Sequence, residues 1–291
     1  MYKIQINLGG KWDSYLVPIY QALKLVENKF DFTIKKSKSI PTWSITVNGE
    51  IVAYIAHADG FHFSKLDWGN ISKRDYQRIF KFHYSPSVFD YSIYGAYKDR
   101  ILPCGLYRWW KSTKFNRQDL LTRKRPVDVV ALMRCYNTAT PSNSKKAWVV
   151  ARKTLKLEAQ KLEKFYNIRA RANIPFEKYE KLLLDTKIGF IWSATSYLGW
   201  KIPEFTQQGV VMITEPLGKN YPLVNDTVFE NNVHCVFCKD PNLFGQVAVK
   251  LLKDKERFNY LQKNVINLWE KKLAPEKVGE WYFKKIIEVY E

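Results

Sequence analysis

Short apolar strands alternate with helices through the second half of the sequence, and few architectures accommodate that order. The segment "VDVVALMRCYN", which begins at Val127, is nearly continuous in apolar residues, as is typical of a strand buried on both faces of a sheet. Further strands are expected at "NIRARANI", "KIGFIWSA", "VVMITEP" and "VHCVFCK", with a helix before each of the first three. This alternation predicts a doubly wound, mostly parallel α/β sheet.

The first half predicts a second α/β unit. It opens with a strand, a glycine turn and a helix, "YKIQINL", "GGKWDS" and "YLVPIYQALKLVENKF", and further strand candidates follow up to "RILPCGLYRWW". Apolar density then falls and basic residues cluster around residues 111–126. We therefore expect two Rossmann-like domains that face a cleft, an N-terminal domain over 1–125 and a C-terminal domain over 126–291 with a helical tail.

The chain is strongly basic, with 47 Lys and Arg residues against 28 Asp and Glu residues and a formal charge of +19. This balance favours an anionic partner, which could be nucleic acid, an acidic membrane surface or a phosphorylated small molecule. No apolar run approaches the roughly 20 residues of a membrane span, and the first residues lack the layout of a signal peptide. We expect a cytoplasmic protein.

The four cysteines are sparse, and they fit buried thiols in a reducing compartment better than a disulfide framework. His234, Cys235 and Cys238 have a spacing found in metal sites. No second Cys-x-x-Cys pair accompanies them, and the alternation in "VHCVFC" indicates a strand. We therefore expect no structural zinc there.

The stretch "GWKIPEFTQQGVVMITEP", residues 199–216, places a carboxylate where a helix should begin. Pro203 suits the first turn of a helix, and Glu204 beside it benefits from the positive end of the helix dipole. Its oxygens would remain available to accept hydrogen bonds from hydroxyl groups. Because ligands of open α/β sheets bind at the carboxyl ends of the strands, Glu204 is a candidate clamp for a ribose.

This stretch, together with "KIGFIWSATSYL" before it and "VHCVFCKDP" after it, resembles the second domain of GT-B glycosyltransferases. The resemblance implies that the unit binds the nucleotide of a sugar donor such as UDP-glucose, and that Glu204 holds the ribose hydroxyls. Retaining members commonly carry a second Glu where this chain has Ser196, so the stereochemical outcome stays open. The family also implies a basic residue for the donor diphosphate, and Arg134, Lys145 and Lys146 are the candidates.

Several further residues are candidates with open alternatives. Gly9 and Gly10 follow a strand and would either approach the donor phosphates or form a tight turn. A catalytic base is expected at His57 or Asp59 in "YIAHADGFHF", with His62 and His83 as competitors. Glu215 would either reach the cleft or cap a loop.

The acceptor is sought in the basic and aromatic segment between Lys98 and Arg125. Cations that track phosphates and aromatic rings that stack on bases suit nucleic acid, and the candidates are Arg108, Trp109, Trp110, Lys111, Lys114 and Arg117. The build resembles bacteriophage DNA glycosyltransferases, which implies a hydroxymethylated base in DNA as acceptor, reached by base flipping in the host cytoplasm.

Other interpretations remain open. The same segment suits an anionic membrane surface, which would make the protein a peripheral glycan or lipid glycosyltransferase. A non-catalytic module that binds nucleic acid is a further alternative. A second basic stretch, residues 145–171, is either part of such a surface or a solvated helix face. The chain shows no prominent Asp-x-Asp triplet, so we expect transfer that needs no metal or other cofactor.

Overall fold

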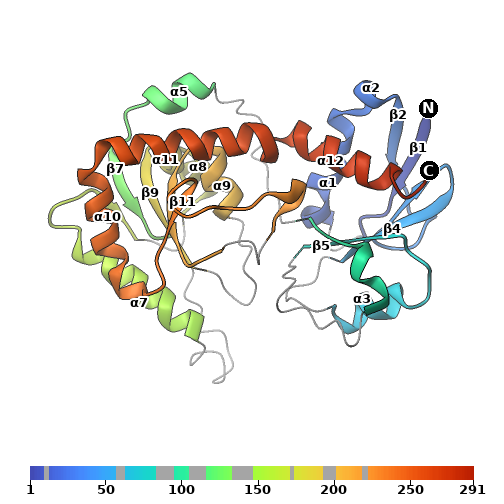
Figure 1. Ribbon diagram of the computed structural model, residues 1–291, viewed down its shortest axis with the longest axis horizontal. Helices are drawn as coiled ribbons and strands as arrows, with labels where there is room; N and C mark the ends of the chain where they lie inside the picture. Colours follow the sequence, from blue (N-terminus) through green and yellow to red (C-terminus); the bar gives the residue numbers. More distant parts are fainter. Residues whose placement is uncertain are drawn as a thin grey trace. The chain divides into compact units, whose positions relative to one another are not determined.

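The computed structural model describes residues 1–9, 13–56, 63–82, 95–104, 116–132, 147–170, 174–192, 201–217 and 222–291. The chain folds into two compact units. The first comprises Met1–Trp109, Asn220–Val228 and Glu270–Glu291, and the second comprises Trp110–Lys219 and Phe229–Trp269. Each unit is built around its own sheet (Figure 1).

The first unit contains a six-stranded sheet of order β2-β1-β3-β4-β5-β6. Its strands are β1 (Tyr2–Ile6), β2 (Phe32–Lys36), β3 (Ser44–Val47), β4 (Glu50–Ala56), β5 (Arg78–Lys81) and β6 (Ile101–Pro103). Its helices are α1 (Asp13–Leu25), α2 (Glu27–Phe30), α3 (Lys65–Ile71), α12 (Pro275–Ile287) and the 3₁₀ turns η2 (Gly95–Arg100) and η3 (Val224–Asp226). The first unit therefore has the α/β architecture that the sequence predicts.

One strand of the first sheet runs against its neighbours. Strand β3 pairs antiparallel with both β1 and β4, whereas β1–β2, β4–β5 and β5–β6 are parallel pairs. The two-residue turn Asn48-Gly49 joins β3 to β4, and its φ angles of 51° and 94° are both positive. Asn and Gly tolerate this backbone conformation, which the tight turns of hairpins require, so the local sequence explains the reversal.

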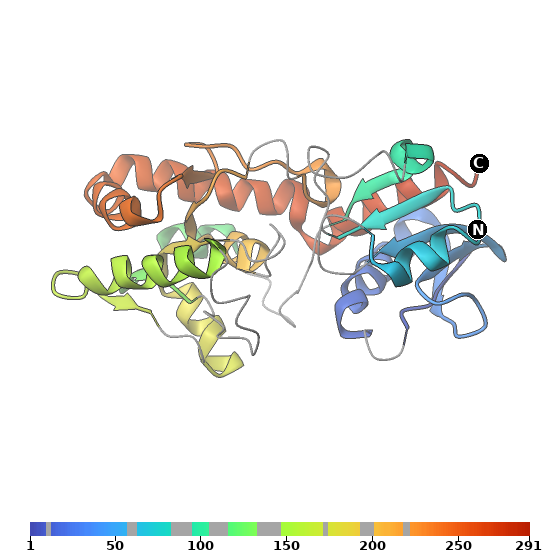
Figure 2. The same cartoon turned by 90° about the horizontal axis from the view of Figure 1, so that it is seen from below.

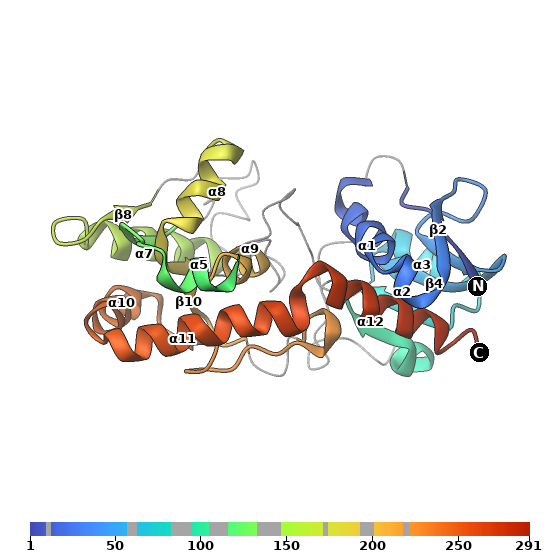
Figure 3. The same cartoon turned by 90° about the horizontal axis from the view of Figure 1, so that it is seen from above.

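The C-terminal helix α12 belongs to the first unit (Figure 3). It packs along α1, where Gly279 lies so close to the carbonyl of Ala22 that a Cβ would overlap it. Phe283 stacks on Phe30 and Phe32, with ring centroids 4.8 and 4.6 Å apart. All of residues 126–291 were expected in the second domain. In the structure, the packing of α12 against α1 and the aromatic rings of Phe30 and Phe32 places this last helix in the first unit.

The second unit contains a five-stranded parallel sheet of order β11-β10-β9-β7-β8. Its strands are β7 (Val127–Val130), β8 (Ile168–Arg169), β9 (Thr186–Ile191), β10 (Val211–Thr214) and β11 (Cys235–Phe237). Its helices are α5 (Arg117–Thr122), α7 (Ala147–Lys161), α8 (Phe176–Leu184), α9 (Lys201–Gln207), α10 (Phe244–Lys253), α11 (Lys255–Leu268) and the 3₁₀ turn η4 (Pro241–Leu243). A π-helical turn at Trp269–Leu273 follows α11, and the chain passes from the second unit to the first after Trp269.

Apolar layers on the two faces of this sheet confirm the doubly wound prediction. On one face, Leu155 of α7 and Phe244 of α10 pack into the main cluster with strand residues such as Phe190. On the other, Gly189 of β9 leaves room for the ring of Phe205 from α9, which a Cβ at position 189 would overlap. The near-continuous apolar strands predicted from the sequence are therefore explained by burial on both faces.

Candidate functional site

The order of the second sheet identifies the edge at which a ligand should bind. With its strands numbered from β7, the order is 2-1-3-4-5, and the winding direction reverses between β7 and β9. Ligands of open α/β sheets bind at the carboxyl ends of the strands beside such a reversal. The segments that follow β7 and β9 start at this point, after Leu132 and Trp192.

Several predicted donor-binding residues fall in those segments. Arg134, Lys145 and Lys146 follow β7, and Ser196 follows β9. All four lie outside the described residues. In the chain they follow the two strands that flank the switch point, and their roles remain predictions.

Glu204 lies in the first turns of α9, the helix that follows β9. The helix begins at Lys201 rather than at Pro203, so Glu204 is its fourth residue. The carboxylate is buried, with only 4% of the residue exposed. Its Oε2 accepts a hydrogen bond of 2.7 Å from the hydroxyl of Tyr179 on α8. Both carboxylate oxygens were expected to be available, whereas one already accepts a hydrogen bond from a residue of a neighbouring helix.

Tyr179 is a site residue that sequence reasoning missed. It lies 25 positions before Glu204 within an ordinary amphipathic helix, and no local spacing links the two. The ring also lies near a cation, because Nζ of Lys201 is 5.9 Å from the ring centroid. Tyr179 thus contacts the Glu204 carboxylate through its hydroxyl and lies near the ammonium group of Lys201 through its ring.

Arg152 is a second missed residue. It lies on α7, and its Nε donates a 3.0 Å hydrogen bond to the carbonyl of Trp192, the first residue after β9. From the sequence, Arg152 is only one of the cations in the basic stretch of residues 145–171. The structure brings its guanidinium to the carboxyl end of a switch-point strand, where an anionic ligand group is expected.

Glu215 directly follows the last residue of β10 and is 7% exposed. It is therefore a buried carboxylate at the carboxyl end of the strand next to β9. Burial at a strand end is compatible with both of its predicted roles, contact with a ligand and the capping of a loop.

The backbone conformation and the close packing at position 9 of the first unit explain why a glycine, Gly9, stands there. Its φ of +66° belongs to the left-handed region, and a Cβ at this position would overlap the indole of Trp43. Its N–H donates to Oδ1 of Asn7 at 3.0 Å, which closes a local turn. These contacts support the tight-turn interpretation, and Gly10 lies outside the described residues.

The candidate base and most of the acceptor segment lie outside the described residues. This applies to His57, Asp59, His62, His83, Arg108, Trp109, Trp110, Lys111 and Lys114. Arg117 is described and is the first residue of α5, with a partly exposed side chain.

Arg125 was counted among the basic residues of the acceptor segment, but it is buried. Its guanidinium donates to the carbonyls of Thr186 and Gln208 at 2.7 Å, of Leu120 at 3.3 Å and of Leu183 at 3.4 Å. Burial lowers the pKa of Arg125 to about 10. The residue therefore joins elements of the second unit and is withdrawn from any surface that binds polyanions.

His234 and Cys235 have local contacts in the second unit. Cys235 begins β11 and is fully buried, and burial raises the pKa of its thiol. His234 Nδ1 accepts a hydrogen bond of 3.2 Å from the backbone N–H of Glu230. Among the residues that the structure describes, no group of three or more His, Cys, Asp or Glu side chains is placed to hold a metal ion.

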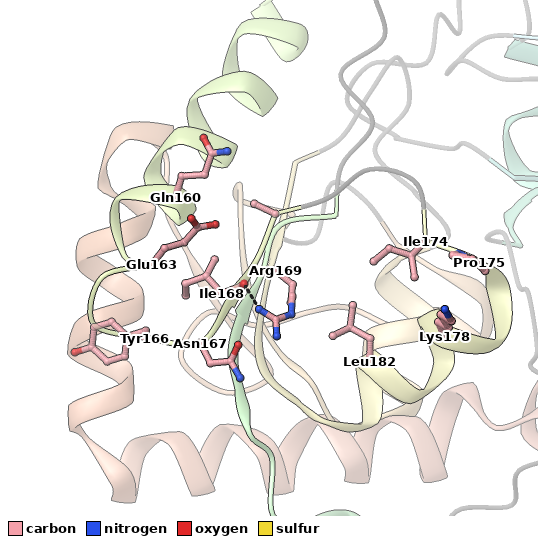
Figure 4. Close-up of a pocket in the computed structure, with 11 residues that line it drawn as sticks. Gln160, Glu163, Tyr166, Asn167, Ile168, Arg169, Ile174, Pro175, Lys178 and Leu182 are labelled. Carbon is pink, nitrogen blue, oxygen red and sulfur yellow. Dashed lines mark hydrogen bonds between the residues drawn. The ribbon is translucent and has the colours of Figure 1, made fainter.

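A cavity of about 980 Å³ lies at the open edge of the second sheet (Figure 4). It is bounded by the edge strand β8 on one side and by α8 on the other. Its charged lining consists of Glu163, Arg169 and Lys178, and Arg169 Nη1 donates to the carbonyl of Ile168 at 3.1 Å. Neither Glu204 nor Glu215 lines this cavity, so it is distinct from the candidate nucleotide site.

Comparison with known proteins identifies the fold. No protein-family model matches the sequence, and no curated protein sequence matches it significantly. Among solved structures, a mutant of TarM from S. aureus, in complex with fondaparinux, alpha-GlcNAc-glycerol and UDP, superimposes with a TM-score of 0.52 at 12% identity. The match covers 93% of this chain and 58% of TarM.

Two further structures are similar at lower TM-scores. The pneumococcal O-GlcNAc transferase GtfA, in complex with UDP and GlcNAc, gives 0.47 at 11% identity and covers 92% of this chain and 55% of GtfA. HepE from Anabaena, in complex with UDP-glucose, gives 0.46 at 9% identity and covers 81% of this chain and 72% of HepE. The chain thus spans little more than half the length of TarM and GtfA, and the comparison with TarM shows that it has a GT-B-like fold.

Proposed function

We propose that this chain is a glycosyltransferase that moves a sugar from a UDP-sugar to a hydroxyl group of an acceptor. One observation carries the proposal: beside the switch point of a parallel sheet, a buried carboxylate in the first turns of a helix is oriented by a tyrosine hydroxyl. A carboxylate held in this way is suited to accept hydrogen bonds from the two hydroxyls of a ribose. The complexes of TarM, GtfA and HepE with UDP or UDP-glucose support this choice of donor.

The proposed roles follow from charge and position. Glu204 accepts hydrogen bonds from the ribose, and Tyr179 fixes the carboxylate. Arg134, Lys145 and Lys146, joined by Arg152, bind the diphosphate and stabilise the negative charge that develops on it as it leaves. Gly9, Gly10, Ser196 and Glu215 are the remaining candidates for contact with the donor.

The proposed reaction is a single group transfer. The acceptor oxygen forms a bond to the anomeric carbon, and the bond between that carbon and the β-phosphate oxygen breaks with its electron pair going to UDP. The acceptor proton passes to a base, for which His57 and Asp59 are the candidates.

The acceptor of this proposed enzyme is a separate proposal. A hydroxymethylated base in DNA is the acceptor that the sequence favours, through Arg108, Trp109, Trp110, Lys111, Lys114 and Arg117. A lipid or cell-surface glycan is the alternative acceptor. The third interpretation is a non-catalytic module that binds nucleic acid and has no acceptor.

The ribose contact can be tested by removing either partner of the hydrogen bond. We expect the wild type to bind UDP more tightly than 2′-deoxy-UDP, by about tenfold or more, because a hydrogen bond to a charged group contributes about 1.5–3 kcal/mol. Glu204→Gln should bind UDP more weakly and lose most of this preference. Glu163→Gln, which alters an exposed acid of the edge cavity, is the matched control and should behave as wild type. An undiminished preference for UDP in Glu204→Gln, measured by titration calorimetry, would refute the role of Glu204.

A further inference from the structure

Helix α7, the yellow-green helix of Figure 2, carries apolar side chains that are exposed to solvent. Val150 and Leu157 are 54% and 57% exposed, and they lie two turns apart on one face, about 11 Å along the helix axis. Phe165, in the turn after the helix, is 80% exposed. Leu243 of η4, which packs along α7, is 42% exposed. Scattered exposed apolar residues are ordinary, but this row, with two members on the helix and two on the segments after and beside it, indicates an interaction surface.

Lysines surround this row. Lys153, Lys161 and Lys164 are exposed and Lys156 is half-buried. Lys161 forms an ion pair with the buried Glu158, yet its side chain stays 70% exposed. From Val149 to Tyr166 the one exposed acid is Glu163. The face is therefore both apolar and positively charged.

We propose that this α7 face, defined by Val150, Leu157, Phe165 and the lysines beside them, binds the surface of an anionic lipid bilayer. Apolar side chains enter the boundary between headgroups and acyl chains while lysines contact anionic headgroups. Nucleic acid would use the lysines but would leave the apolar row in water. A second copy of this chain would bring like charges together.

The proposal concerns attachment and not insertion across the bilayer. None of the helices that the structure describes has the length and apolar content that a bilayer crossing demands. The face lies on the second unit, whereas the sequence analysis sought a membrane surface in the segment from Lys98 to Arg125. It is also independent of sugar transfer, because it requires no occupant at Glu204.

Vesicle flotation with the full chain tests the proposal. We expect binding to vesicles of phosphatidylcholine with about 30% phosphatidylglycerol, weaker binding at high salt and little binding to phosphatidylcholine alone. Leu157→Ser/Phe165→Ser should lower binding to the anionic vesicles by about tenfold or more. Lys153→Glu/Lys164→Glu should lower it by a similar factor.

The matched control is Tyr260→Ser/Lys263→Glu, which removes an exposed apolar residue and an exposed lysine from α11 of the same unit. It should bind the vesicles within about twofold of wild type, and circular dichroism should show all variants folded, because exposed substitutions change stability little. Failure of the wild type to bind anionic vesicles overturns the proposal. So does full binding by Leu157→Ser/Phe165→Ser, since a purely electrostatic surface that also binds nucleic acid would behave in that way.

Discussion

Replacing Arg125 by methionine should destabilise the second unit. In a chain this rich in Lys and Arg, the sequence alone would place Arg125 at the surface. The guanidinium is buried and donates to four carbonyl oxygens, two of them at 2.7 Å. Methionine keeps an unbranched apolar chain of similar length and removes every donor. The substitution therefore isolates the hydrogen bonds from the packing of the side-chain stem.

The magnitude follows from two opposing contributions. Two short hydrogen bonds from a charged donor contribute about 1.5–3 kcal/mol each, or roughly 3–6 kcal/mol together. Against this, burial disfavours the charged form and lowers the pKa of Arg125 from 12.5 to about 10, and methionine avoids that cost of about 3 kcal/mol. The carbonyls left without donors add to the loss. We expect a net destabilisation of about 2 kcal/mol.

Hydrogen exchange of the amides in β9 and β10 measures this loss within the second unit itself. A loss of about 2 kcal/mol should speed exchange of the slowest amides roughly 30-fold. Arg123→Met is the matched control, because Arg123 forms an exposed ion pair of 3.1 Å with Asp185 that should contribute less than about 1 kcal/mol. The reasoning is refuted if Arg125→Met exchanges no faster than Arg123→Met, since desolvation would then outweigh the hydrogen bonds.

Three further substitutions test the site and its support. Tyr179→Phe should weaken UDP binding about tenfold by freeing the Glu204 carboxylate, and calorimetric binding equal to wild type would contradict the orienting role. Gly189→Ala should lower the free energy of unfolding by about 1–3 kcal/mol because the new methyl group overlaps Phe205, and Phe205→Leu should restore part of it in urea titrations; an unchanged midpoint for the single variant would show that the ring moves aside. Burial holds the pKa of His234 below its usual value, so its stabilising contribution is present above pH of about 6.5 and is lost as pH falls through the lower folded-state pKa. His234→Asn should flatten this acid-side loss in urea midpoints measured from pH 7 to 5, and a wild-type pH profile in the variant would count against it.

Local pattern was sufficient for the architecture of the second sheet. Strands β9 and β10 are apolar almost throughout because both of their faces are covered, and α9 connects them in the chain. The hairpin of the first sheet also has a local cause in Asn48 and Gly49. Both features depend on residues that are adjacent in sequence, although the sequence analysis predicted only the first of them and did not identify the Asn48-Gly49 turn.

The features that were missed depend on contacts between distant segments. Helix α12 has the pattern of any amphipathic helix, and only its packing along α1 assigns it to the first unit. Tyr179 and Arg152 fit ordinary helices, and their partners Glu204 and Trp192 lie 25 and 40 positions away. Arginine is a residue type that is usually exposed, whereas Arg125 is buried like a core residue.

The most direct test of sugar transfer is the release of UDP from UDP-glucose and UDP-GlcNAc by the full chain. The reactions would contain duplex DNA with hydroxymethylated bases, anionic vesicles with a lipid that bears a free hydroxyl, or no acceptor. We predict that one acceptor class stimulates release by the wild type and that Glu204→Gln reduces the stimulated rate by about tenfold or more. No stimulated release from either donor, together with equal binding of UDP and 2′-deoxy-UDP, would contradict the proposed glycosyltransferase.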